Sequence, residues 1–229
     1  MLAVKTVDRS KTFATFIEGD SNRLAKSMAM AASENPAGSY NPLYIYGGRG
    51  TGKSHLLQAV CNEAKLRGRE FFFGGLSTGS NLRLPEGPTS FVVLDDVDIN
   101  LPEIDESLNE FVNTGGQLVL SGGSSPEDLA ESPLSEMISG TGSSADLQMP
   151  EEELRVAILQ ARADAENIAL PDDAARFIAS HIPGSIQNLI GGLERVKALS
   201  SLSGQSITRF GAIQALREYL WKDEGEGFE

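Results

Sequence analysis

Residues 40–60 read YNPLYIYGGRGTGKSHLLQAV, and this stretch decides the fold. The apolar run 43–46 (LYIY) is rich in residues that favour strands and predicts a short buried strand. A glycine-rich loop follows it. From Lys53 to Arg67 apolar side chains recur at helical spacing until Gly68 ends the helix. A strand, a glycine loop and a helix in this order are the context in which a phosphate-binding loop forms.

The loop GGRGTGKS, residues 47–54, matches the pattern G-x-x-x-x-G-K-[ST] of nucleotide-binding proteins. Its glycines let backbone N–H groups point at a phosphate, and the following helix N-terminus adds favourable partial charge. Lys53 is expected to meet the β- and γ-phosphates, and the Ser54 hydroxyl to bind Mg²⁺. The predicted nucleotide contacts of this loop are Gly47, Gly48, Arg49, Gly50, Thr51, Gly52, Lys53, Ser54 and His55.

An acidic pair follows the most apolar strand candidate, FVVLDD at 91–96. A nearly unbroken apolar run is typical of a strand buried on both faces of a parallel sheet. Asp95 and Asp96 are therefore expected at the carboxyl edge of the sheet, where such folds bind ligands. Asp95 is the predicted partner of the hydrated Mg²⁺, and Asp96 is the predicted catalytic residue that orients an attacking water. The alternative is a solvated acidic pair that opens a loop.

The remaining pattern predicts two subdomains. Further strands are expected at 69–73, 117–121 and 145–148, and helices at 22–32, 103–113, 151–167, 171–182, 185–199 and 208–220. Ser21 is a candidate cap for the first helix. Strands dominate before Pro150 and helices after it. The expected domains are an α/β core at 1–149, a helical lid at 150–222 and an acidic tail at 223–229.

The amino-acid composition limits the classes of function that are expected for this chain. Of the 229 residues, 32 are acidic and 19 basic, for a net charge of −13, so direct DNA binding is not expected. Residues 84–154 contain sixteen Asp or Glu and no Lys or Arg. This acidic block either is solvated or faces a basic protein partner. No apolar run approaches the roughly 20 residues that cross a bilayer, which favours a cytoplasmic protein without membrane contact. The single cysteine, Cys61, is expected in the core.

Several segments resemble one family. The segment TFATFIEGDSNRLAKSMAMAASENP (12–36), together with 40–60, is similar to the opening of the AAA+ ATPase module of the bacterial DnaA/Hda family. DLQMPEEELRVAIL (146–159) and SIQNLIGGLERVKAL (185–199) resemble the family's lid. The resemblance implies an α/β P-loop AAA+ fold, in which helices sandwich a parallel five-stranded sheet and a helical lid roofs an ATP or ADP pocket. It also implies purine contacts from the arm around Phe16 to Asn22.

Departures from the family pattern are equally informative. Family members trigger hydrolysis with an arginine finger just before the lid, worth roughly 10³ to 10⁵ in rate. Here Glu136 or Ile138 stands at that place, depending on the alignment. Glycines 122 and 123 replace a Ser-Asp pair of the sensor strand. Gln187 replaces the family's nucleotide-sensing arginine, where it either donates a neutral hydrogen bond or lies on the surface.

The leading interpretation is a nucleotide-binding regulator or adaptor of replication initiation. The 22 residues of 69–90 are too few for the helical insertion with which initiators hold single-stranded DNA, and the sequence ends after the lid, so no helix-turn-helix domain is expected. ATP or ADP would select one conformation of the chain, and a DnaA-like AAA+ partner would recognise that conformation. The alternatives are a slow standalone ATPase and a structural interaction protein with a vestigial site. Assembly into a homo-oligomer stays open.

Overall fold

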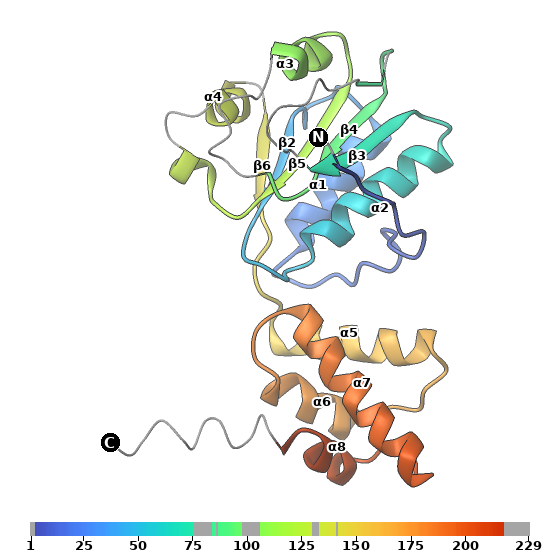
Figure 1. Cartoon of the computed structure of the whole chain (residues 1–229). Coiled ribbons are helices and arrows are strands. Elements are labelled where there is room, and N and C mark those ends of the chain that lie inside the picture. The colour runs from blue at the N-terminus through green and yellow to red at the C-terminus, as the bar shows by residue number, and fades with distance from the viewer. Residues whose placement is uncertain are drawn as a thin grey trace. The chain divides into compact units, whose positions relative to one another are not determined.

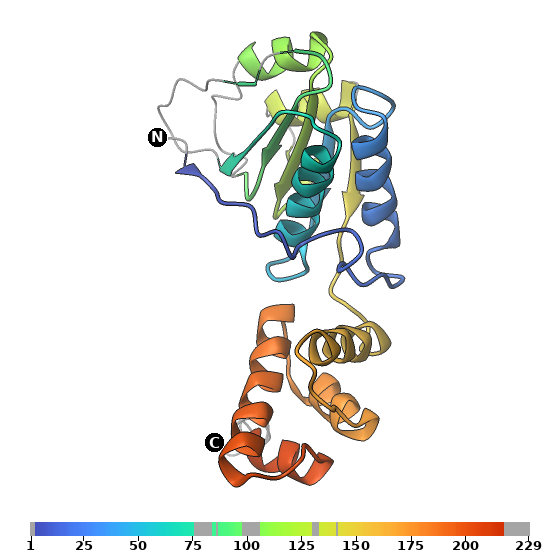
Figure 2. The same cartoon turned by 90° about the vertical axis from the view of Figure 1, so that its right-hand side faces the viewer.

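The computed structural model describes residues 3–75, 84–85, 87–97, 106–129, 133–140 and 142–217. The chain divides into two compact units, Met1–Gln148 and Met149–Glu229. The first is a sheet covered by helices, and the second consists of helices (Figures 1 and 2). Each unit has its own hydrophobic core.

Among its described residues, the first unit contains a six-stranded sheet with the order β1-β3-β4-β5-β2-β6. Its five parallel strands are β3 (Phe71–Gly75), β4 (Phe91–Leu94), β5 (Gln117–Gly122), β2 (Leu43–Tyr46) and β6 (Ser143–Asp146). The predicted parallel five-stranded sheet is confirmed. The sequence did not predict β1 (Ala3–Val4), which pairs antiparallel with β3 at the sheet edge, because two residues show no periodicity.

Helices cover both faces of the sheet. The helices α1 (Arg23–Glu34) and α2 (Lys53–Leu66) lie on one face, and α3 (Glu106–Asn113) and α4 (Pro133–Gly140) lie on the other (Figure 2). Successive strand residues point to opposite faces. Val93 therefore packs in the core beneath α1 and α2, whereas Val92 and Leu94 pack in the core beneath α3 and α4. This two-sided burial explains why β4 is an unbroken apolar run.

Some local expectations were wrong. The helix α1 starts after Asn22, and no side chain caps it; the Ser21 hydroxyl is buried and has no hydrogen-bond partner in the described part of the chain. The last strand lies at 143–146 instead of 145–148, because β6 pairs with all four residues of β2. The structure also adds α4 and a short 3₁₀ helix, η1 (Pro126–Leu129), which the sequence did not predict.

In the described residues of the second unit, 149–217, four helices pack around one core. They are α5 (Glu152–Ala165), α6 (Asp172–His181), α7 (Ile186–Ser203) and α8 (Arg209–Ala215). The Ser185 side chain caps α7 by accepting from the N–H of Asn188, and Gly204 ends this helix at a φ of 65°. The end of the predicted helix at 208–220 and the predicted tail at 223–229 lie outside the described residues. In the described parts, no helix combines the length and the apolar character that crossing a bilayer requires.

Cys61 is expected to be chemically inert in the native protein. It is fully buried in α2, and burial raises the pKa of its thiol, so almost no thiolate is available to react. A colorimetric thiol reagent should leave Cys61 unmodified in buffer and modify it completely in urea. Rapid stoichiometric labelling of the folded protein would contradict this placement of Cys61.

Candidate functional site

The phosphate loop joins β2 to α2 with a backbone that requires glycine. Gly47, Gly50 and Gly52 have φ values of 145°, 77° and 110°, in the region that side chains rarely adopt. A Cβ atom on Gly47 would lie 2.2 Å from the carbonyl oxygen of Leu147. The buried Thr51 holds the turn, since its hydroxyl donates to the carbonyl of Gly48 at 3.1 Å.

The loop presents a row of unused donors. In the described part of the chain, the backbone N–H groups of residues 48–54 donate to no protein acceptor. The first N–H groups of α2 that find one are those of His55 and Leu56, which both donate to the carbonyl of Gly52 at 3.0 Å. Several N–H groups at one helix N-terminus form a site suited to an anion with several oxygens, such as a phosphate. The loop therefore fits the predicted ligand.

Lys53 lies folded over this loop. Its ammonium donates to the carbonyls of Gly47 and Gly48, both at 2.7 Å. Burial lowers the pKa of Lys53, and the charges of Asp96 and Asp95 counteract this effect. Carbonyls are weaker acceptors than phosphate oxygens, so the ammonium can exchange them for a charge-assisted bond. Arg49, the other predicted cationic contact, is exposed on the loop.

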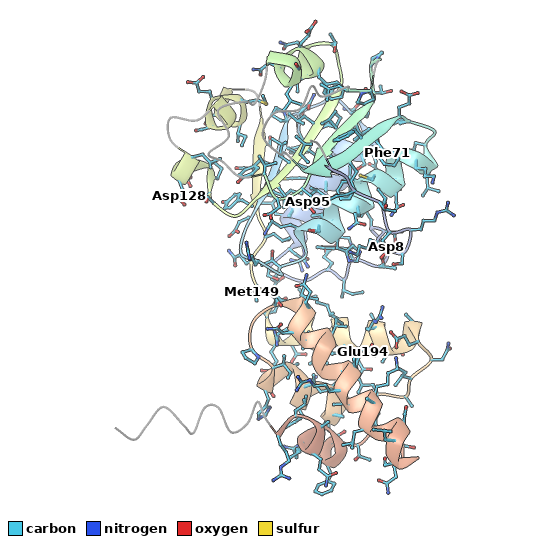
Figure 3. All side chains as sticks on the ribbon, in the orientation of Figure 1. Asp8, Phe71, Asp95, Asp128, Met149 and Glu194 are labelled. Carbon is cyan, nitrogen blue, oxygen red and sulfur yellow. The ribbon has the colours of Figure 1, made fainter. Side chains whose placement is uncertain are left out.

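Asp95 is the centre of the site. It lies at the carboxyl end of β4, where Figure 3 labels it, and its side chain is only 7% exposed. Its Oδ1 accepts from the Ser54 hydroxyl at 3.1 Å and from the Ser121 hydroxyl at 3.0 Å. The structure thus brings together the two predicted metal ligands, Ser54 and Asp95. Their role in binding Mg²⁺ stays a prediction.

Sequence reasoning missed Ser121. It is the next-to-last residue of β5, the strand between β2 and β4, so its hydroxyl lies between the phosphate loop and Asp95. The signal was a polar residue at the carboxyl end of a buried strand, but only the strand order shows that this strand lies beside Asp95. The glycines at 122 and 123 follow it, and a Cβ on Gly122 would lie 2.3 Å from the Tyr44 hydroxyl.

Asp96 has an unusual backbone. Its φ is 61°, a left-handed conformation that is uncommon outside glycine, and its N–H donates to the Ser121 hydroxyl at 3.1 Å. Its side chain is exposed, unlike that of Asp95. The turn therefore directs two adjacent carboxylates into different surroundings. An exposed carboxylate beside the phosphate loop is accessible to water, as the predicted catalytic role requires, and that role stays a prediction.

Sequence reasoning also missed Lys5. Its ammonium lies 3.0 Å from Oδ2 of Asp95, and its backbone N–H donates to the carbonyl of Phe73 at 3.0 Å. Lys5 belongs to the segment of residues 5–12, which we call the N-terminal strap. Ninety residues separate Lys5 from Asp95, so no local pattern could have indicated this ion pair.

One polar face of α2 holds the N-terminal strap. His55, Gln58 and Asn62 recur at helical spacing along this face. The amide of Gln58 accepts from the N–H of Asp8 at 2.8 Å. Asn62 donates to the carbonyls of Asp8 and Lys11 at 2.9 and 2.7 Å. The helix that carries the phosphate loop therefore also fixes the strap.

The predicted purine-contact residues hold the arm in place. Phe16 is 5% exposed and meets the His55 ring edge-on, with 5.3 Å between the ring centres. His55 also lies 3.3 Å from the carbonyl of Thr12, and burial lowers the pKa of His55. The Asn22 amide closes the arm by accepting from the N–H of Gly19 and donating to the carbonyl of Ile17, both at 3.0 Å. Their contact with a purine stays a prediction.

Gln187 lies exposed in the first turn of α7, in the second unit. Its contact with a nucleotide stays a prediction. The described residues contain no group of three or more His, Cys, Asp or Glu placed to hold a metal ion. A Mg²⁺ ion at a phosphate loop needs few protein ligands, because phosphate oxygens and waters complete its coordination. The Ser54–Asp95 pair fits such an ion.

The structure has a P-loop AAA+ fold: helices cover both faces of a parallel sheet, a glycine loop precedes α2, and the acidic residue Asp95 follows β4, two strands away from β2. Residues 7–71 match the family model described as the bacterial DnaA ATPase domain. The chromosomal replication initiator protein DnaA of Enterococcus faecalis is 32% identical over 229 residues, which cover 90% of this chain and 51% of that protein.

Solved structures agree on the fold. Domain III of the Thermotoga maritima replication initiation protein DnaA superimposes with a TM-score of 0.73 at 22% identity, covering 94% of this chain and 99% of that one. AMPPCP-bound DnaA from Aquifex aeolicus gives 0.72 at 23% identity, with coverage of 96% and 71%. The chain is therefore similar in sequence to the ATPase region of bacterial DnaA proteins, and it shares the fold of their solved domains. It spans about half the length of the curated relatives it matches.

Proposed function

We propose that this chain binds ATP or ADP at residues 47–54 and acts as a nucleotide-controlled regulator or adaptor of bacterial replication initiation, in the DnaA/Hda class. The observation that carries the proposal is the row of unused N–H donors at 48–54 beside Lys53 and the Ser54–Asp95 pair. An aligned relative that bears a bound AMPPCP supports the choice of an adenine nucleotide.

Within this site each side chain has a role. Lys53 exchanges its loop carbonyls for phosphate oxygens. Ser54 and Asp95 would hold Mg²⁺, which would neutralise phosphate charge when bound. Ser121 keeps Asp95 oriented. Asp96 orients a water for slow hydrolysis. Residues 16–22 contact the nucleotide from the arm.

Hydrolysis is expected to depend on a partner, because the segment before the lid offers no arginine that could act as a finger. Residues 84–154 contain no Lys or Arg, and at the expected finger position Glu136 is exposed and Ile138 is buried. The next base, Arg155, is occupied: its guanidinium donates to the carbonyls of Ala179, Ile182 and Gly184 inside the second unit. A DnaA-like AAA+ neighbour would therefore supply an arginine finger to the nucleotide site of this chain, whereas this chain would supply none to the site of the neighbour.

ATP turnover tests this proposal. The protein alone should hydrolyse ATP very slowly, and a DnaA-like AAA+ protein with its own arginine finger should raise the rate by about 10³-fold or more. Turnover should be measured first with Lys53→Ala in this chain and then with the phosphate-loop lysine of the partner replaced by alanine, which identifies the site that hydrolyses. Stimulation that survives in the Lys53→Ala version of this chain would locate the chemistry in the partner and contradict the acceptor role.

The second candidate is a slow standalone ATPase. The exposed carboxylate of Asp96 favours this function, because its charge acts on Lys53 and opposes the lowering of the Lys53 pKa by burial. Steady turnover that no AAA+ partner changes would support it. Direct DNA contact is not expected under either function, because the net charge is −13.

A further inference from the structure

The carboxylate of Asp95 already has a positive partner. Its Oδ1 accepts two hydroxyls, from Ser54 and Ser121, and its Oδ2 lies 3.0 Å from the Lys5 ammonium. The Asp95 side chain is 7% exposed, whereas that of Lys5 is 40% exposed. A buried carboxylate is costly without a positive partner. Lys5 supplies this charge from a position that water can reach.

The N-terminal strap sets the position of Lys5. At Lys5 itself, the backbone N–H donates to the carbonyl of Phe73 in β3. Three residues later, the backbone N–H of Asp8 donates to Gln58 of α2, and the carbonyl of Asp8 accepts from Asn62 of the same helix. Figure 3 labels Asp8, which belongs to the strap, and Asp95, which follows β4. The strap is therefore held by hydrogen bonds that do not involve the Lys5 ammonium, and it places this ammonium beside Asp95.

A divalent cation at Ser54 and Asp95 would draw on the same negative charge. Two cations that share one carboxylate repel each other, and this repulsion is strong where water is excluded. The ammonium is attached to a flexible side chain that is partly exposed, so it can leave Asp95 without unfolding the sheet. The bonds of Asp8 to α2 do not depend on that ion pair.

We propose that Lys5 takes the place of the divalent cation at Asp95 while the metal is absent and is displaced when the metal binds with nucleotide. This inference rests on the proposed nucleotide site. Lys5 neutralises Asp95 for a metal-free nucleotide and competes with the metal for the same carboxylate. The start of the N-terminal strap therefore reports whether the bound nucleotide carries a metal ion.

The test compares nucleotide affinity with and without metal. Dissociation constants of a fluorescent ADP analogue are measured in Mg²⁺ and in EDTA for the full chain and for Lys5→Gln. Loss of Lys5 weakens the metal-free complex and relieves the competition in the metal complex. The dissociation constant in EDTA divided by the dissociation constant in Mg²⁺ should therefore rise by about tenfold, which is the scale of one lost charge interaction. Lys5→Arg should restore the original ratio.

Lys11→Gln is the matched control, because it removes the same charge from the same strap without touching Asp95. It should leave the ratio unchanged. A second readout is amide hydrogen exchange in the wild-type protein: residues 3–7 should exchange faster with Mg²⁺ and ADP than with ADP in EDTA. Should Lys5→Gln fail to fold, this exchange experiment decides the question alone.

Two outcomes overturn the inference, and they are distinguishable. If the wild type binds the analogue, but Lys5→Gln has the same ratio and the strap exchanges equally in both conditions, Lys5 does not compete with the metal and the nucleotide site stands. If the wild type binds no analogue in either condition, the proposed function fails and the inference fails with it.

Discussion

Lys53→Ala is expected to weaken the binding of ADP and ATP by about a hundredfold, which corresponds to roughly 3 kcal/mol. Lys53 is the first residue of α2, and its ammonium is the predicted phosphate ligand of this helix that carries a full positive charge. In the structure it is satisfied by the two carbonyls of Gly47 and Gly48, so it is placed directly over the loop. Its removal takes away charge-assisted bonds that no neighbouring N–H can replace.

Calorimetric titration of nucleotide into the variant measures this loss. Lys65→Ala is the matched control, since Lys65 is exposed in the last turn of the same helix. It should bind nucleotide like the wild type, and both variants should unfold at similar temperatures. Wild-type affinity in Lys53→Ala would show that the nucleotide binds elsewhere or is held without the loop.

Arg155→Ala is expected to lower the free energy of unfolding of the second unit by about 3 kcal/mol. Arg155 is 9% exposed in α5, and its guanidinium donates to the carbonyls of Ala179, Ile182 and Gly184. Burial lowers the pKa of Arg155, yet an arginine remains charged. Without it, the carbonyls around the C-terminal end of α6 lose their donors and a buried space is left empty.

Arg162→Ala provides the comparison on the same helix. Arg162 is 49% exposed and pairs with Glu166 at 2.6 Å. An exposed pair of this kind contributes at most about 0.5 to 1 kcal/mol. Urea denaturation followed by circular dichroism should therefore separate the two variants clearly. Equal, small effects would mean that the carbonyls released by Arg155 are satisfied by water.

The fold was largely predictable because its signals are local. The run LYIY, the loop at 47–54 and the helix from Lys53 follow one another in the chain and also in space. The apolar run at 91–94 indicated a strand buried on both faces, and both faces are indeed covered by helices. Asp95 could be placed beside Ser54 because parallel strands end at a common edge of the sheet.

The parts that were missed depend on contacts between distant segments. Ser121 became visible as a partner of Asp95 only through the strand order. The two residues of β1 show no periodicity, yet this strand brings Lys5 to Asp95 across ninety residues. The helix α4 lies in a segment rich in Ser and Gly, whose low helix propensity hides it, while buried Met137 and Ile138 hold it on the sheet.

Titration of ADP into the purified wild-type protein in Mg²⁺, followed by calorimetry, tests the central claim most directly. The account predicts saturable binding of one nucleotide per chain, which Lys53→Ala weakens by about a hundredfold. Absence of any binding heat or saturation in the wild type, measured on protein from which resident nucleotide has been removed, would contradict the claim that residues 47–54 form a nucleotide site.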